Sequence, residues 1–161
     1  MKDEGLRLPQ RTSLPHFAGI EWPNVSVIHF VTVCTKERRP LLASKMVHGL
    51  LRKAWSPVDF FQVGRYVIMP DHLHLFCAPI LPNAGYLKAW VTFWKSYVSK
   101  NWQRERPAQL WQRDFWDTQL RRGENFEMQW DYIRMNPVRK GLVKKPNDWP
   151  YQGEMNPLKW D

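Results

Sequence analysis

The sequence predicts an α+β fold of the ferredoxin-like, split βαβ kind. Its strands and helices follow one another along the chain in the order β-α-β-β-α-β. The strands form an antiparallel sheet with helices on one face and an added C-terminal, tyrosine-bearing helix on the other. Two observations predict this fold. Short segments rich in Val, Ile and Phe alternate with segments whose apolar residues recur at helical spacing. The 161 residues, 43% of them hydrophobic and 14% aromatic, also suffice for one domain with a substantial core.

The first strand and first helix are separated by a charged turn. Residues 25–35 are rich in β-branched and aromatic side chains, which favour a buried strand, and the charged residues 36–40 end it. Residues 43–55 carry apolar side chains at helical spacing, and Pro57 ends this helix.

A hairpin is predicted next. Residues 60–69 and 72–78 form two apolar runs, and the Pro70-Asp71 pair between them is a turn signal. The two strands are therefore expected to be antiparallel neighbours.

The second half repeats the alternation and adds a helix. We expect a helix at 84–102, a strand at 115–122 and a last helix at 126–136. Asn125 is the expected N-cap of the last helix, and Pro137 is expected to end it.

Charge and cysteine content limit the functional class. Lys and Arg total 24 against 15 Asp and Glu, a net charge of +9, so we expect a partner that carries phosphate or acidic lipid. No signal-peptide pattern opens the chain, and its longest apolar run is too short for a membrane span. Cys34 and Cys77 have no CxxC spacing and lie in strand-like runs, so reduced core thiols are expected in an intracellular protein.

His72 and His74 are the clearest local chemical signal. Side chains alternate along a strand, so the two imidazoles leave the same face about 6.6 Å apart, while Leu73, Leu75 and Cys77 point to the packed face. Such a pair can converge on one cation. The alternative is that both histidines only form hydrogen bonds on a polar surface.

The last helix carries a phenol and an amide one turn apart. Tyr132 and Asn136 lie at the margin of an apolar stripe formed by Phe126, Trp130, Ile133 and Pro137. Because Asn136 precedes the proline, we expect it at the helix C-terminus, where the negative end of the dipole favours a cation. The alternatives are a tyrosine at the core edge and an asparagine that only caps the helix.

These residues predict a metal-assisted reaction at phosphorus. His72, His74 and Asn136 offer two nitrogens and an oxygen, a set that suits Mg²⁺ or Mn²⁺ with water and phosphate oxygens. HExxH and paired CxxC motifs do not occur, which disfavours zinc hydrolysis. Tyr132 could then attack phosphorus, and a phosphotyrosyl diester would preserve the linkage for strand transfer.

Three ordered blocks carry a family resemblance. They are VIMPDHLHLF from Val67, WQRDFWDTQLR from Trp111 and YIRMNPVRKGLV from Tyr132. Together they resemble the single-tyrosine HUH transposases of the insertion-sequence-200 type, and most closely the REP-associated tyrosine transposases. The resemblance implies that His72 and His74 are the HUH histidines. It also makes Tyr132 the nucleophile and places Asn136 near the metal. Thr118 stands where related sequences often carry histidine, so a role for that position is not carried over.

The resemblance also implies the substrate, partners and organisation. It implies metal-dependent cleavage and transfer of single-stranded DNA with a REP-like hairpin, by a bacterial protein of the cytoplasm and nucleoid. We expect a basic arm at 1–24, the catalytic domain at 25–136 and a basic tail at 137–161 within the same domain. The extended tail favours a monomer over a homodimer, and it either folds back through Trp149 and Tyr151 or reads DNA bases. The cations expected to contact DNA phosphates are Lys88, Lys95, Arg121, Arg122, Arg134, Arg139, Lys140 and Lys144.

Two other functions fit the same residues. Split βαβ sheets with basic edges also bind single-stranded nucleic acid without catalysis. A metal-dependent nuclease that uses water as its nucleophile is the other alternative. A covalent enzyme-DNA adduct distinguishes the transposase from both.

Overall fold

One antiparallel sheet of five strands forms the centre of the computed structural model, which describes residues 27–80, 86–105, 107–120 and 123–158. The strand order across the sheet is β4-β1-β3-β2-β5. The strands are β1 (Ile28–Cys34), β2 (Phe61–Ile68), β3 (His72–Pro79), β4 (Trp116–Leu120) and β5 (Gln152–Glu154). The first four confirm the predicted strands and their hairpin, and β5 is an addition.

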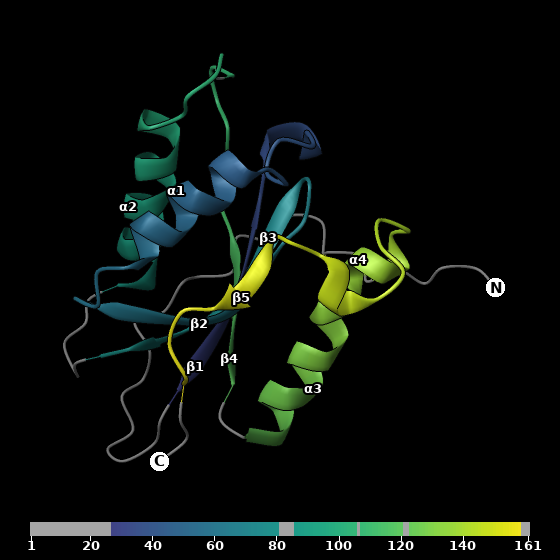
Figure 1. Cartoon of the computed structure of the whole chain (residues 1–161). Helices are drawn as coiled ribbons and strands as arrows, with labels where there is room; N and C mark the ends of the chain where they lie inside the picture. Colours follow the sequence, from purple (N-terminus) through teal and green to yellow (C-terminus); the bar gives the residue numbers. More distant parts are fainter. Residues whose placement is uncertain (1–26, 81–85, 106, 121–122, 159–161) are drawn as a thin grey trace.

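Helices cover both faces of the sheet (Figure 1). The helices α1 (Lys45–Trp55) and α2 (Leu87–Lys100) lie on one face, and α3 (Gly123–Arg134) and the short α4 (Asn136–Arg139) lie on the other. This arrangement confirms the split βαβ fold with an added helix on the second face. The predicted basic arm at 1–24 lies outside the described residues.

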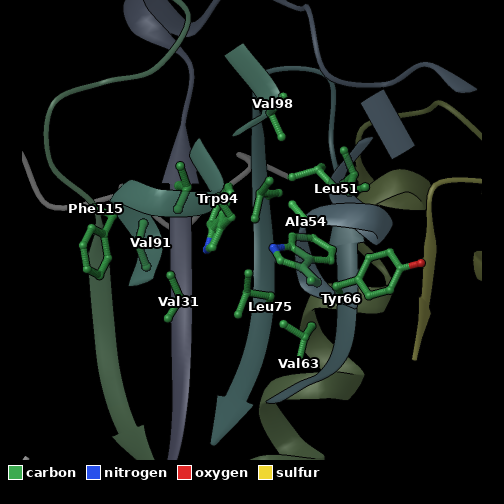
Figure 2. Packing of buried hydrophobic residues seen from close by; sticks show 14 of the residues in the cluster. Val31, Leu51, Ala54, Val63, Tyr66, Leu75, Val91, Trp94, Val98 and Phe115 are labelled. Carbon is green, nitrogen blue, oxygen red and sulfur yellow. The ribbon is translucent and has the colours of Figure 1, made fainter. Parts of the chain in front are cut away.

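The larger core fills the space between the sheet and the first two helices. Figure 2 shows Val31 and Leu75 of the sheet packed below Trp94 of α2. Trp55 of α1 meets Trp94 edge to face, with ring centroids 5.7 Å apart, and both indoles are buried. Burial of such large apolar surfaces is the main source of stability in a domain of this size. The catalytic candidates take no part in this core.

A second, smaller core holds α3 and the tail against the opposite face. Phe76 of β3 meets Phe126 of α3 with ring centroids 4.7 Å apart, and Ile133 is buried in the same cluster. Trp149 of the tail is also buried there, and its indole Nε1 donates a 2.9 Å hydrogen bond to the carbonyl of Ile68. The tail therefore folds back on the core, and its β5 strand pairs with β2.

Replacing Trp149 with alanine should destabilise the protein markedly. The change empties a buried site and leaves the carbonyl of Ile68 without its indole donor, so we expect a loss of about 3–5 kcal/mol of unfolding free energy. Urea unfolding followed by circular dichroism measures the loss. Lys145→Ala, at an exposed position of the same tail, serves as control and should change stability little. Equal stability of the two variants would show that the tail does not hold the second core.

Two predicted helix boundaries were wrong. The helix α3 begins at Gly123, so Asn125 is its third residue and not its N-cap. Pro137 does not end a helix, because the chain turns at Met135 and Pro137 lies in the first turn of α4. Proline suits a first turn, where its missing N–H would have no helical partner.

The two cysteines lie on different strands as free, buried thiols, which confirms the prediction. Cys77 faces the larger core, whereas Cys34 lies beside Arg38. Across the described part of the chain, none of the helices has the length and apolar character that crossing a membrane requires.

Candidate active site

The two histidines lie side by side on the face of β3 that α3 covers. Their ring centroids are 4.8 Å apart, and only 8% of His72 and 6% of His74 is exposed. Leu73, Leu75 and Cys77 alternate with them and are buried in the larger core on the opposite face. The strand periodicity therefore placed both imidazoles correctly.

Asp71 and Arg38 hold the ring of His72. The Nδ1 of His72 lies 2.7 Å from Oδ1 of Asp71, and the Nε of Arg38 donates to Oδ2 of the same carboxylate at 2.9 Å. Partial burial alone would raise the pKa of Asp71, but the hydrogen bonds from His72 and Arg38 hold it well below its ordinary value. The carboxylate thus stays charged and accepts the Nδ1 proton of His72, which leaves Nε2 as the free ring nitrogen.

A strained turn brings Arg38 to this carboxylate. Glu37 and Arg38 have φ angles of 58° and 54°, a left-handed conformation that costs of order 1 kcal/mol or more per non-glycine residue. The hydroxyl of Thr35 donates to the carbonyl of Asp71 at 3.1 Å, and the backbone N–H of Thr35 donates to it at 3.0 Å. These bonds tie the turn to the start of β3.

Thr32 and Phe30 of β1 hold the ring of His74. Thr32 is the register partner of His74, and its Oγ1 lies 2.8 Å from Nδ1 of the imidazole. The ring of Phe30 stacks on the imidazole with centroids 5.3 Å apart. Neighbouring side chains thus hold the Nδ1 atoms of both histidines, and within the described residues no hydrogen bond involves either Nε2 atom.

Burial keeps His74 neutral. Its pKa lies well below the ordinary value, first because burial removes the imidazole from water and then because the charges of His72, Arg38 and Arg139 oppose a second proton. A neutral imidazole is the form that binds a metal ion.

The low pKa of His74 predicts that acid destabilises the protein. Below the ordinary imidazole pKa of 6.5, the unfolded chain takes up a proton that the folded chain does not, so stability is full above that pH and falls beneath it. Urea unfolding between pH 5 and 8 measures this slope. Burial also lowers the pKa of His48, so this histidine adds to the same dependence of stability on pH. The comparison is therefore with His74→Gln, which retains His48 and should lose less stability as the pH falls. Identical slopes would contradict the assignment to His74.

Tyr132 and Arg139 form a compact pair at the end of α3. The guanidinium of Arg139 lies over the phenol ring, 4.0 Å from its centroid, and Nη2 donates a 2.7 Å hydrogen bond to the Tyr132 carbonyl. The same Nη2 donates to Oδ1 of Asn136. Tyr132 is 38% exposed, so its ring is accessible to a ligand. Because α3 covers the face of the sheet that carries the histidines, the tyrosine and the histidines lie on the same side of the sheet.

Asn136 does not lie where the sequence predicted. It is the first residue of α4, two residues beyond the end of α3, and not the last residue of a longer helix. Its amide oxygen accepts from Arg139, which gives it a partner within the protein. The carboxamide oxygen therefore accepts a hydrogen bond from Arg139 in this structure, and its role as a metal ligand stays a prediction.

The histidine pair fits a divalent ion. Both rings present Nε2, and their Nδ1 atoms are held by a carboxylate and a hydroxyl, the usual outer partners of metal-binding histidines. Within the described residues, no group of three His, Cys, Asp or Glu side chains could enclose an ion. A bound Mg²⁺ or Mn²⁺ would therefore take its other ligands from amide, water or phosphate oxygens, as these ions commonly do.

The predicted DNA-binding cations are spread over both faces. Arg139, Lys140 and Lys144 lie beside the site on α4 and the segment after it, and all three are exposed. Arg134 pairs with Asp131 at 3.3 Å. Lys88 and Lys95 lie on α2, across the sheet from the histidines. Arg121 and Arg122 lie outside the described residues.

Lys95 is used within the fold. Its Nζ donates a 2.8 Å hydrogen bond to the Gln112 carbonyl, and burial lowers its pKa to about 8. This position is poor for a phosphate contact at the histidine site.

Sequence reasoning missed the residues that hold the histidines. Asp71 is adjacent to His72 in the chain, so its proximity could have been noticed. Arg38 and Thr32 are distant in sequence, and only the strand register and the strained turn bring them to the rings.

Two curated proteins resemble the chain in sequence. The REP-associated tyrosine transposase of Escherichia coli (strain K12) is 29% identical over 127 residues, which cover 76% of this chain and 73% of the relative. The putative REP-associated tyrosine transposase of Haemophilus influenzae (strain ATCC 51907 / DSM 11121 / KW20 / Rd) is 34% identical over 103 residues, covering 56% of this chain and 57% of the relative. No protein-family model matches the chain.

Solved structures share the fold. A REP-associated tyrosine transposase bound to a REP hairpin has a TM-score of 0.65 and 23% identity, covering 82% of this chain and 78% of its own. A putative transposase from Deinococcus radiodurans has a TM-score of 0.50 and 18% identity, covering 74% of this chain and 95% of its own. The sequence matches and the shared fold confirm the predicted resemblance: the chain is similar to the REP-associated tyrosine transposases.

Proposed function

We propose that this protein cleaves and transfers single-stranded DNA beside a hairpin, with Tyr132 as the nucleophile and a divalent ion at His72 and His74. The phenol oxygen of Tyr132 forms a bond to phosphorus, and the bond from phosphorus to the 3′ oxygen breaks. The phenol proton passes to solvent, and the departing 3′ oxygen takes up a proton. The product is a 5′-phosphotyrosyl linkage and a free 3′ hydroxyl.

One observation carries the proposal. Both imidazoles of the HxH motif are held at Nδ1 by neighbouring side chains, and the exposed Tyr132 lies near the end of α3, the helix that covers the same face of the sheet. A surface pair of histidines would need neither the carboxylate of Asp71 nor the stacked ring of Phe30. The arrangement is the one expected of ligands oriented for an ion.

Each side chain has a defined task in this reaction. Asp71 holds the proton of His72 on Nδ1, and burial holds His74 neutral. Arg38 neutralises the Asp71 carboxylate from the outside. A bound Mg²⁺ or Mn²⁺ would supply Lewis-acid polarisation of a phosphoryl oxygen.

The DNA partner follows from the family and the charge. Hairpin DNA is the ligand of the related transposase in the solved complex, and we extend that ligand to this chain. The exposed residues Lys140 and Lys144 follow the nucleophile directly, so a strand bound along them would pass Tyr132. We expect a monomer to suffice, with the tyrosine and both histidines of one chain forming the site.

The test uses the full chain with a labelled single-stranded hairpin oligonucleotide and Mg²⁺ or Mn²⁺. A transposase of this type gives a labelled band that migrates with the protein in SDS. Cleavage without such a band would indicate a nuclease that uses water, and binding without cleavage would indicate a binding module. Either of those outcomes would overturn the proposal.

A further inference from the structure

Arg139 makes two contacts with Tyr132 and a third with Asn136. Its guanidinium stacks on the phenol ring at 4.0 Å, and Nη2 donates to the Tyr132 carbonyl and to Oδ1 of Asn136. Such a planar cation over an aromatic face is a favourable contact, and the two hydrogen bonds fix its orientation. The rotation of the phenol is therefore restricted by a cation that lies against it.

The backbone of α4 is anchored so that the guanidinium reaches back over α3. Gly141 has a φ of 72° and its N–H donates to Val138, while the N–H of Leu142 donates to Pro137, both at 2.9 Å. This pattern is a Schellman motif, which ends a helix at a glycine in the left-handed conformation. Pro137 is buried, so α4 is packed against the protein at its other end. Arg139 is thus presented by a fixed backbone.

Most hydrogen-bond donors of Arg139 remain available. A guanidinium has five N–H groups, and the bonds to Tyr132 and Asn136 both use Nη2. Within the described residues, Nε and Nη1 donate to no acceptor. The side chain is also exposed. Among the described residues, three donors of one fixed cation are therefore free beside the proposed nucleophile.

A phosphate is the ligand that matches these free donors. The Nε and Nη1 groups can each donate a charge-assisted hydrogen bond to a phosphate oxygen, and the cation would stabilise the charge that develops on the equatorial oxygens during phosphoryl transfer. The neighbouring Lys140 and Lys144 also carry charge, but no contact places either of them against Tyr132.

We propose that Arg139 is a catalytic residue that binds the scissile phosphate while it holds the ring of Tyr132 beside it. This inference rests on the function proposed above and deepens it. Asn136 then serves as a positioning residue, because its amide oxygen orients the guanidinium.

The first test compares Arg139→Ala with Lys140→Ala, which removes one neighbouring exposed charge. At saturating hairpin DNA, we expect Arg139→Ala to slow formation of the covalent adduct by about 100-fold, as loss of one transition-state donor does. Lys140→Ala should weaken hairpin binding and slow adduct formation much less than Arg139→Ala does. Arg139→Lys, which keeps the charge but loses the planar fork, should recover only part of the rate.

The second test separates phosphate binding from a purely structural role. A methylphosphonate at the scissile position removes one charged oxygen, and its penalty is measured in wild type, Arg139→Ala and Lys140→Ala. If Arg139 binds this phosphate, the penalty in Arg139→Ala is at least about tenfold smaller than in the other two. If urea unfolding shows that Arg139→Ala is unstable, the methylphosphonate penalty is measured in Arg139→Lys instead.

The outcomes distinguish this inference from the proposed function. If wild type forms no adduct, the proposed function is wrong. If wild type forms the adduct but the methylphosphonate penalty is the same in all variants, only the role of Arg139 is wrong. An unchanged adduct rate in Arg139→Ala would also overturn it.

Discussion

Replacing Tyr132 with phenylalanine should abolish the covalent enzyme-DNA adduct and leave hairpin binding intact. The change removes only the phenol oxygen, which is the atom that attacks phosphorus, so we expect a loss of roughly 10³-fold or more. The ring itself keeps its contact with Arg139 and its place on α3. Gel electrophoresis in SDS with labelled DNA measures the adduct, and a mobility shift measures binding.

Tyr86→Phe is the matched control for this change. Tyr86 is 65% exposed and precedes α2, on the opposite face of the sheet, so its hydroxyl should have no effect on the reaction. An adduct that persists in Tyr132→Phe, or cleavage at the wild-type rate, would show that another group attacks the DNA. Equal loss in Tyr86→Phe would indicate a general effect on the fold.

Replacing His72 and His74 with alanine should remove both metal binding and cleavage. The two Nε2 atoms are the nitrogen donors for the ion, and loss of a direct ligand should weaken Mn²⁺ binding by at least roughly 100-fold. Binding of Mn²⁺ to the free protein is followed by electron paramagnetic resonance, so the result does not depend on activity. Hairpin binding should largely persist, because the exposed cations of the α4 region are unchanged.

His48→Ala is the control for the histidine variants. His48 lies on α1, where its Nε2 is 2.7 Å from the hydroxyl of Tyr66, so it should affect stability and not Mn²⁺ binding. Mixing Tyr132→Phe with the double histidine variant tests whether one chain supplies the whole site. We expect no adduct from the mixture, because both groups act within one chain. Wild-type Mn²⁺ binding by the double variant would contradict the metal site.

The alternation of side chains along a strand correctly predicted which face of the sheet the histidines occupy. The alternation around Leu73 fixed which face of β3 each side chain occupies, because a period of two leaves no other arrangement once the apolar set is buried. The apolar stripe on α3 likewise predicted the buried Phe126 and Ile133. The positions of these residues follow from the periodicity of a strand or helix whose apolar face is buried.

Features set by long-range contacts could not be read in the same way. The three-residue strand β5 exists because the tail returns to pair with β2, with Trp149 filling the second core. Asn136 begins a new helix because the chain turns at Met135. The following proline predicted the end of a helix, but it lies in the first turn of α4. Arg38 reaches Asp71 only through two left-handed residues that local propensity disfavours.

Peptide mapping of the covalent adduct tests the central claim most directly. Wild-type protein is allowed to react with hairpin DNA, the product is digested with nuclease and protease, and the peptides are analysed by mass spectrometry. The account predicts a nucleotide linked through a 5′ phosphate to Tyr132 and to no other side chain. A nucleotide on a different residue, or cleaved DNA with an unmodified Tyr132 peptide, would contradict it.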